Sequence, residues 1–198
     1  MNEITRTGWD VLDEARAMLR AAVAGVPADG WQRPTPCTEW NVAQVLQHAA
    51  LDQGAWAAVI SGTQPSGENP FAPSGDLGAE PLAYAEAALE ASVPAWTAVS
   101  ADAESVPTPL PSGPMAPADG AAAAALDAAI HAWDIAVATG QGSPLTPELA
   151  RALTPLARSI VEPLRQYGAY APALEPAADA DDAATLLGYL GRSPGWAA

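Results

Sequence analysis

The chain has 198 residues, 49% of them hydrophobic and 16% charged, which is the composition of a globular protein that buries a core and not of a disordered one. The formal net charge of −15 comes from 23 acidic and 8 basic residues, and every basic residue is an arginine. This balance excludes nucleic acid and anionic membranes as expected partners, because phosphate binding needs a basic surface.

The first predicted helix runs from about Thr5 to Ala24. Charged residues cover one side of this segment, and Gly25 and Pro27 follow it as stop signals. The apolar positions on the other side recur at spacings of three and four, the pattern of an amphipathic helix: Val11, Ala15, Met18 and Ala22.

A second helix is predicted from Asn41 to about Ser61, with Gly62 as its stop. Asn41 and Gln44 have the spacing of a capping box, in which two side chains satisfy the free backbone groups of the first turn. One of the two histidines of the chain, His48, falls within the inward stripe of this helix: Val45, His48, Asp52, Trp56 and Val59.

Residues 62–79 are rich in Gly, Pro, Ser and Asn and are predicted to form a long loop. A third helix is predicted to open at Pro81 and to reach about Trp96, since proline suits the first position of a helix. Pro94 is expected to kink this helix or to split off its last turn. The proline-rich segment 101–118 is predicted to be an irregular connection.

The fourth predicted helix runs from about Asp119 to Thr139, and Gly140 ends it. Its core stripe consists of Leu126, Ile130, Trp133 and Val137. A second stripe, about 100° away around the helix, carries Asp127, His131 and Asp134.

The C-terminal part is also predicted to be helical. A helical region starts after Thr146-Pro147 and reaches about Gln166, with interruptions expected at Pro155 and Pro163. A last short helix is predicted from about Asp181 to Leu190.

No segment alternates apolar and polar residues as a β-strand does, so we predict an all-α fold, a four-helix bundle with short C-terminal helices. Residues 1–198 are predicted to be one domain, with the core bundle at about 5–140 and a helical extension at about 146–198. Cys37 is the only cysteine, which leaves no disulfide framework. Since the N-terminus lacks a signal-peptide pattern and no long uncharged apolar run occurs, we expect a cytoplasmic protein.

The two histidines and one aspartate suggest a metal site. Asp127 and His131 lie four residues apart, so both side chains leave one face of the same helix. Imidazole and carboxylate groups bind zinc, nickel, iron or manganese, and helical bundles build metal sites from inward side chains of facing helices. We therefore predict that His48, Asp127 and His131 hold a divalent metal, with positions left open for a ligand.

Each of these residues also has a plain structural interpretation. Asp127 and His131 can form an ordinary ion pair within one helix, and His48 can be a core histidine bonded to Asp52. If the metal binds, Asp52 and Asp134 are the candidates to accept the remaining N–H of a ligating histidine and so fix its orientation.

Three segments together carry a family resemblance: TPCTEWNV at residues 35–42, followed by Leu46-Gln47-His48; DAAIHAWDIA at residues 127–136; and LLGYLGRSPGW at residues 186–196. They resemble the DinB-like metal-binding proteins, in the branch related to the N-terminal domain of mycothiol-dependent maleylpyruvate isomerase. The resemblance implies a DinB-like four-helix bundle whose metal, usually taken as zinc, is bound by His48, Asp127 and His131. It also implies mycothiol as a thiol cosubstrate.

Two departures from the isomerase argue for a different reaction. The ligand carboxylate is the shorter Asp127 where the isomerase has a glutamate, and only a helical tail follows the bundle where the isomerase has a separate C-terminal domain. Arg165 and Arg192 are candidates to bind an acidic substrate, although exposed helix or tail arginines are the commoner case.

The favoured hypothesis is a metal-dependent thiol transferase or isomerase, which activates a low-molecular-weight thiol for transfer to, or isomerisation of, a small electrophile. One alternative is a non-catalytic bundle that binds a metal or a small ligand, and another is a metal-free helical interaction protein. The expected partners are the electrophile and the thiol, and the expected assembly is a monomer or homodimer.

Overall fold

Six α-helices make up the regular structure of residues 5–197, the part of the chain that the computed structural model describes. Within these residues no strand forms, and only two isolated β-bridges occur. The predicted all-α architecture is therefore confirmed. The helices are α1 (Asp10–Ala24), α2 (Val42–Ser61), α3 (Pro81–Thr97), α4 (Pro117–Ala138), α5 (Pro147–Gln166) and α6 (Asp182–Tyr189).

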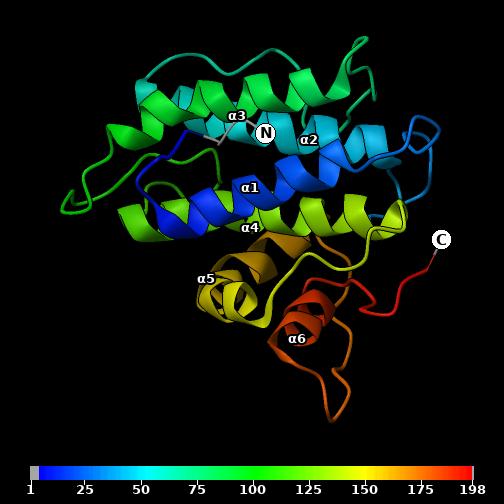
Figure 1. Ribbon diagram of the computed structural model, residues 1–198. Helices are drawn as coiled ribbons and strands as arrows, with labels where there is room; N and C mark the ends of the chain where they lie inside the picture. Colours follow the sequence, from blue (N-terminus) through cyan, green and yellow to red (C-terminus); the bar gives the residue numbers. More distant parts are fainter. Residues whose placement is uncertain (1–4, 198) are drawn as a thin grey trace.

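Helix α4 lies at the centre of the molecule. It packs against α1 and α2 of the bundle on one side and against α5 on the other, while α6 packs on α5. Figure 1 shows α1 to α4 stacked as the bundle, with α5 and α6 below α4. Alanine is the commonest residue of α4, and its small side chain lets neighbouring helices approach closely.

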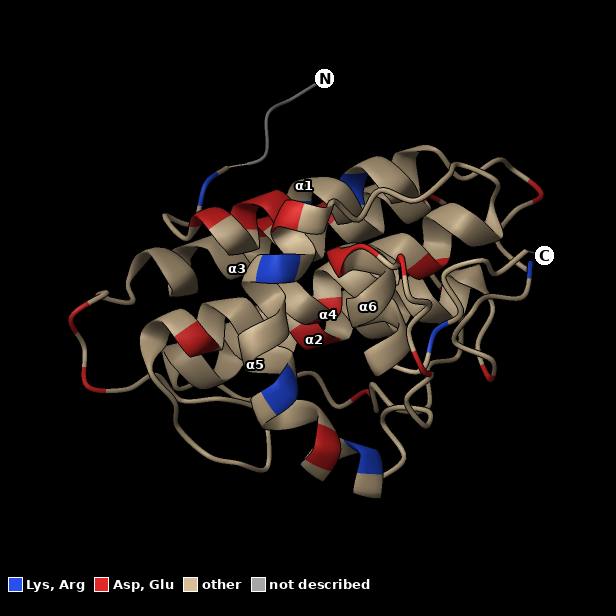
Figure 2. Ribbon diagram, turned by 90° about the horizontal axis from the view of Figure 1, so that it is seen from below, with Lys and Arg blue, Asp and Glu red and all other residues tan. Residues whose placement is uncertain are grey.

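The length and composition of α4 would also suit a membrane span. Most of its apolar stretch is buried inside the protein, however, as expected for the core helix of a soluble-type domain. Seen from the side of α5 and α6, the few arginines lie singly among acidic residues on several elements (Figure 2). The negative charge is thus spread over the molecule.

The structure corrects two predicted helix starts. Helix α1 begins at Asp10 instead of Thr5, because Thr7 turns back to bond the Asp13 carboxylate and Gly8 adopts a φ of +89° that a helix cannot accommodate. Helix α4 begins two residues earlier than predicted, at Pro117, since proline needs no hydrogen-bonded N–H there.

Three internal prolines fail to interrupt their helices. Helix α3 continues through Pro94 to Thr97, where the buried Trp96 packs against Trp56 with ring centroids 5.4 Å apart. Helix α5 continues through Pro155 and Pro163 as one element. Both of these prolines lie on the exposed face of α5, where water can satisfy the carbonyl groups that lose their partners.

The start of α2 follows the prediction. The Asn41 side chain accepts the backbone N–H of Gln44, and the Gln44 side chain accepts that of Asn41. Gly62 ends the helix in a left-handed conformation with φ of +69°. This capping fixes where α2 begins and therefore which face of the helix His48 presents to α4.

Candidate metal centre

The structure brings His48, Asp127 and His131 together between α2 and α4. One ligand atom of each residue lies within 4.8 Å of the others. The Nε2 atoms of His48 and His131 lie 3.3 and 3.4 Å from the same Asp127 oxygen, Oδ1. The three side chains are 11, 19 and 8% exposed for His48, Asp127 and His131, so the cluster is largely buried with Asp127 the most open.

These separations suit a metal ion. Two ligands bound at about 2.05 Å around a tetrahedral ion lie roughly 3.3 Å apart. The donor set of two imidazoles and one carboxylate is also common for zinc and related metals. In addition, Asp127 Oδ2 is buried and has no hydrogen-bond partner within the described residues, so it leaves a negative charge for a cation to neutralise.

The orientation of His48 is set by the loop that follows α2. Its Nδ1 lies 2.8 Å from the carbonyl oxygen of Pro70. A carbonyl can only accept a hydrogen bond, so Nδ1 donates to Pro70 and Nε2 faces Asp127. Trp40 covers this ring, with centroids 4.7 Å apart, and the 68% exposed Phe71 lies 6.0 Å from it.

His131 is oriented in the same way by a carboxylate. Its Nδ1 donates a hydrogen bond to Asp134 Oδ2 at 3.0 Å, which leaves Nε2 directed at Asp127. Asp134 thus occupies the position that the sequence predicted for a group holding a ligating histidine. Both imidazoles thus direct Nε2 at one carboxylate oxygen, an arrangement that a bound cation would suit.

A buried arginine from the C-terminal tail neutralises Asp134. Arg192 donates from Nε and one terminal nitrogen to the two oxygens of Asp134, at 3.1 and 2.9 Å. Both side chains are almost fully buried. Sequence reasoning treated Arg192 as a substrate-binding candidate or an exposed tail residue. The structure corrects this, because its guanidinium is already engaged with Asp134.

Arg165, the other candidate for acidic substrate, is likewise engaged. It donates hydrogen bonds to the carbonyls of Ala171 and Tyr189 and pairs with Glu162. It therefore ties the end of α5 to the segment that follows and to α6.

Asp52 does not accept a hydrogen bond from either histidine, the role that the sequence suggested for it. Within residues 5–197 no hydrogen bond joins it to either histidine, since Pro70 takes the Nδ1 proton of His48 and Asp134 takes that of His131. Its Oδ2 is buried without a hydrogen-bond partner. Burial and the charge of Asp127 raise the pKa of Asp52 well above its usual value.

The charges of the cluster depend on one another. Burial opposes ionisation of Asp127, but the charge and hydrogen bond of His131 together with the hydrogen bond of His48 hold the pKa of Asp127 below its usual range. Burial likewise disfavours a charged His131, yet Asp127 and Asp134 raise its pKa to about 9. The metal-free cluster therefore holds a proton on His131 at neutral pH, in the place where a metal would bind.

Cys37 does not act as a reactive thiol. Burial and the charge of Asp134 raise its pKa to about 11. Because the thiolate is the reactive form, this raised pKa disfavours reaction of Cys37 near neutral pH.

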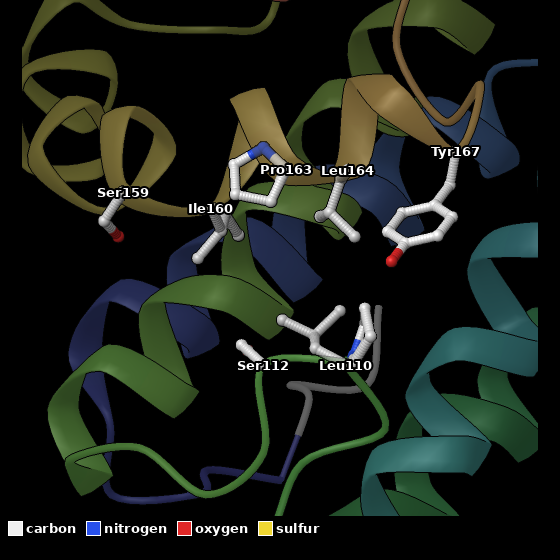
Figure 3. Close-up of a pocket in the computed structure, with 8 residues that line it drawn as sticks. Leu110, Ser112, Ser159, Ile160, Pro163, Leu164 and Tyr167 are labelled. Carbon is white, nitrogen blue, oxygen red and sulfur yellow. The ribbon is translucent and has the colours of Figure 1, made fainter.

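A separate pocket of ≈ 280 Å³ lies between the C-terminal half of α5 and the loop before α4 (Figure 3). None of its lining residues belongs to the histidine–aspartate cluster. It is mostly apolar, being lined by Leu110, Pro111, Ser112, Ser159, Ile160, Pro163, Leu164 and Tyr167.

This chain combines a helical bundle with a His/Asp group that could bind a metal, as DinB-like proteins do. A family model, the mycothiol maleylpyruvate isomerase N-terminal domain, matches residues 12–136 of the chain. The chain belongs to this family, as the three sequence segments indicated.

Two curated proteins similar to this chain are uncharacterized proteins of Mycobacterium tuberculosis, from strains CDC 1551/Oshkosh and H37Rv. Each is 32% identical over 152 residues, which cover 75% of this chain and 76% of the relative. No solved structure matches the chain.

Proposed function

We propose that this protein is a cytoplasmic, metal-dependent enzyme that activates a low-molecular-weight thiol for transfer to, or isomerisation of, a small electrophile. Zinc is the favoured metal and mycothiol the favoured thiol. The observation that carries the proposal is the convergence of two imidazole nitrogens on one oxygen of Asp127, at separations that suit a tetrahedral ion.

The residues of the chain have distinct parts in this proposal. His48, Asp127 and His131 would hold the metal, which when bound supplies a Lewis acid that lowers the pKa of a coordinated thiol. The Pro70 carbonyl and Asp134 orient the two imidazoles. Trp40 packs over His48 and keeps bulk water from that side.

Three protein ligands leave a tetrahedral ion with one free position, the mark of a site that accepts a ligand. The membership in a mycothiol-related family supports a thiol as that ligand. The shorter Asp127 still argues for an electrophile other than maleylpyruvate.

The first test is metal content. Protein purified without chelator and freed of any tag is analysed for bound metal, together with His48→Ala, His131→Ala and Asp127→Asn. We expect near-stoichiometric metal in the parent protein and little in these variants. Asp119→Asn is the matched control, because it removes an exposed carboxylate from the same helix.

The second test is thiol consumption. The parent protein should accelerate the reaction of mycothiol with a small electrophile such as monobromobimane, and the three metal-site variants should not. Metal bound without any acceleration across a panel of electrophiles would favour the non-catalytic bundle. A protein that binds no divalent metal would refute the proposal.

A further inference from the structure

The loop after α2 carries an exposed aromatic ring beside the cluster. Phe71 is the only phenylalanine of the chain, and its side chain is 68% exposed. Its ring centroid lies 6.0 Å from that of His48. Trp40, which also lies beside His48, packs against the hydrophobic core, whereas Phe71 stands outside that core. Single exposed apolar residues are common on proteins, but this one lies at the candidate metal centre.

The segment that presents Phe71, residues 68–75, is fixed to α2 by hydrogen bonds. Three side chains from the first two turns of α2 bond to it: Gln44 to the Pro73 carbonyl, Gln47 to Glu68 and to the Gly75 N–H, and His48 to the Pro70 carbonyl. Pro70 directly precedes Phe71, so the contact that orients His48 also fixes where the backbone of Phe71 lies. Because this backbone is already ordered, Phe71 can contact a bound molecule at little entropic cost.

The ring of Phe71 lies within reach of a small molecule bound to the metal. An ion bound to Nε2 of His48 lies about 2 Å from that atom, so the centre of the Phe71 ring is at most roughly 9 Å from the ion. A flat group attached close to the metal-binding atoms spans much of this separation, and aromatic rings in contact have centroids about 4.5–7 Å apart. A molecule at the open metal position can therefore place such a group against Phe71.

The residues near the cluster favour an uncharged group at this place. Arg192 pairs with Asp134, and Arg165 pairs with Glu162, so the two arginines considered for an acidic substrate are already engaged. The phenyl ring of Phe71 offers a large apolar surface and no polar atom. It therefore suits the apolar part of a bound molecule and not a carboxylate.

We propose that Phe71 is a specificity-determining residue of the candidate metal centre, whose ring contacts a flat apolar group of the electrophile that the site accepts. This inference rests on the proposed function. It names the substrate class as small, uncharged electrophiles that carry an aromatic or other flat apolar group.

The test is the binding of two hydroxamic acids to the Co²⁺-loaded protein. Benzohydroxamic acid and acetohydroxamic acid bind a metal through the same group and differ only in carrying a phenyl or a methyl substituent. The affinity for each is read from the visible absorption of the cobalt, so no turnover is needed. We expect the parent protein to prefer benzohydroxamic acid. Phe71→Ala should bind this compound about threefold to tenfold more weakly, as for the loss of one aromatic contact, and should bind acetohydroxamic acid as the parent does.

Two further variants serve as controls. Phe71→Trp keeps an aromatic ring at the same position and should keep the preference for the phenyl compound. Tyr167→Ala removes an aromatic side chain that is 78% exposed and lines the separate pocket, so it should match the parent protein. The Co²⁺ affinity of every variant is measured first and should equal that of the parent, because Phe71 is not a ligand.

A parent protein without the preference, or equal affinity of Phe71→Ala and the parent for benzohydroxamic acid, would overturn the inference and leave the metal site standing. An equal loss for both compounds, or a loss of Co²⁺ affinity in Phe71→Ala, would also overturn it, because Phe71 would then support His48 and not select the apolar group. Failure of the parent to bind Co²⁺ would instead refute the proposed function, and this inference with it.

Discussion

Replacing Arg192 with methionine should destabilise the protein strongly, because it leaves a buried carboxylate without its cation. Asp134 is 0% exposed, and its two oxygens accept hydrogen bonds from Arg192 at 3.1 and 2.9 Å. Removing one partner of such a buried pair typically costs about 3–5 kcal/mol. His131 remains bonded to Asp134 and holds a proton at neutral pH, so we expect a loss near the lower limit, about 3 kcal/mol.

The assay is urea unfolding at pH 7 with EDTA present, so that metal binding does not contribute to the free energy of unfolding. Arg151→Met is the matched control, since Arg151 and Asp182 form an ion pair at the surface with side chains 66 and 42% exposed. The control should lose only about 0.2–1 kcal/mol. The double variant Arg192→Met/Asp134→Asn should regain part of the loss, because the carboxylate that Arg192 neutralises is then absent.

The effect of Arg192→Met should also depend on pH. Burial opposes the charge of Asp134, but Arg192 and His131 hold the pKa of that carboxyl below its usual value. This stability is present above the unfolded-state pKa of about 3.9 and is lost as the pH falls through the folded-state pKa. Without Arg192 the pKa of Asp134 rises, so the difference between parent and variant should shrink at acidic pH. A loss no larger than that of Arg151→Met at pH 7 would refute the reasoning.

Three further predictions concern the metal site, Cys37 and Gly191. Zinc affinity, measured by chelator competition, should rise about tenfold per pH unit between pH 6.5 and 8.5. The reason is that the metal must displace the proton that His131 holds with a pKa of about 9. A pH-independent zinc affinity would contradict this prediction. The pH dependence of the rate at which iodoacetamide alkylates Cys37 should give a pKa of about 11 in the folded protein and an ordinary thiol pKa in urea. The same pH dependence in both states would show that burial does not raise the pKa of Cys37. Gly191→Ala should lower the free energy of unfolding, measured by thermal unfolding, by about 1–3 kcal/mol, because the φ of +79° and the nearby Ala171 oxygen both disfavour a Cβ there. Gly195→Ala is the control and should leave stability unchanged, since the space around Gly195 is open.

Local signals in the sequence were sufficient for most of the fold. The Asn41–Gln44 capping box and the Gly62 stop define α2 within its own residues, and the structure has both. The prolines of α5 misled because the lost hydrogen bonds and ring clashes at Pro155 and Pro163 are offset by the packing of the buried face of the same helix, which includes Leu153, Leu156 and Val161.

The site was predictable where helical spacing governs it and unpredictable where distant segments meet. Asp127 and His131 share a face by their spacing, and His48 followed from the apolar stripe of its helix. The Pro70 carbonyl could not be foreseen, because a backbone atom in an irregular loop leaves no pattern in the sequence. The pairing of Arg192 with Asp134 joins residues 58 positions apart, and only the scarcity of basic residues could have drawn attention to it.

The three metal-binding candidates stand on helices, whereas Trp40 and Phe71, whose rings lie 4.7 and 6.0 Å from that of His48, belong to connecting segments. Helices tolerate little change without loss of packing, but connections accept substitutions and insertions readily. Under the proposed function, relatives in this family would differ in which small molecule they accept while keeping the same metal-binding residues. Evolution of new specificity would proceed through these connections, and comparison of relatives should begin there.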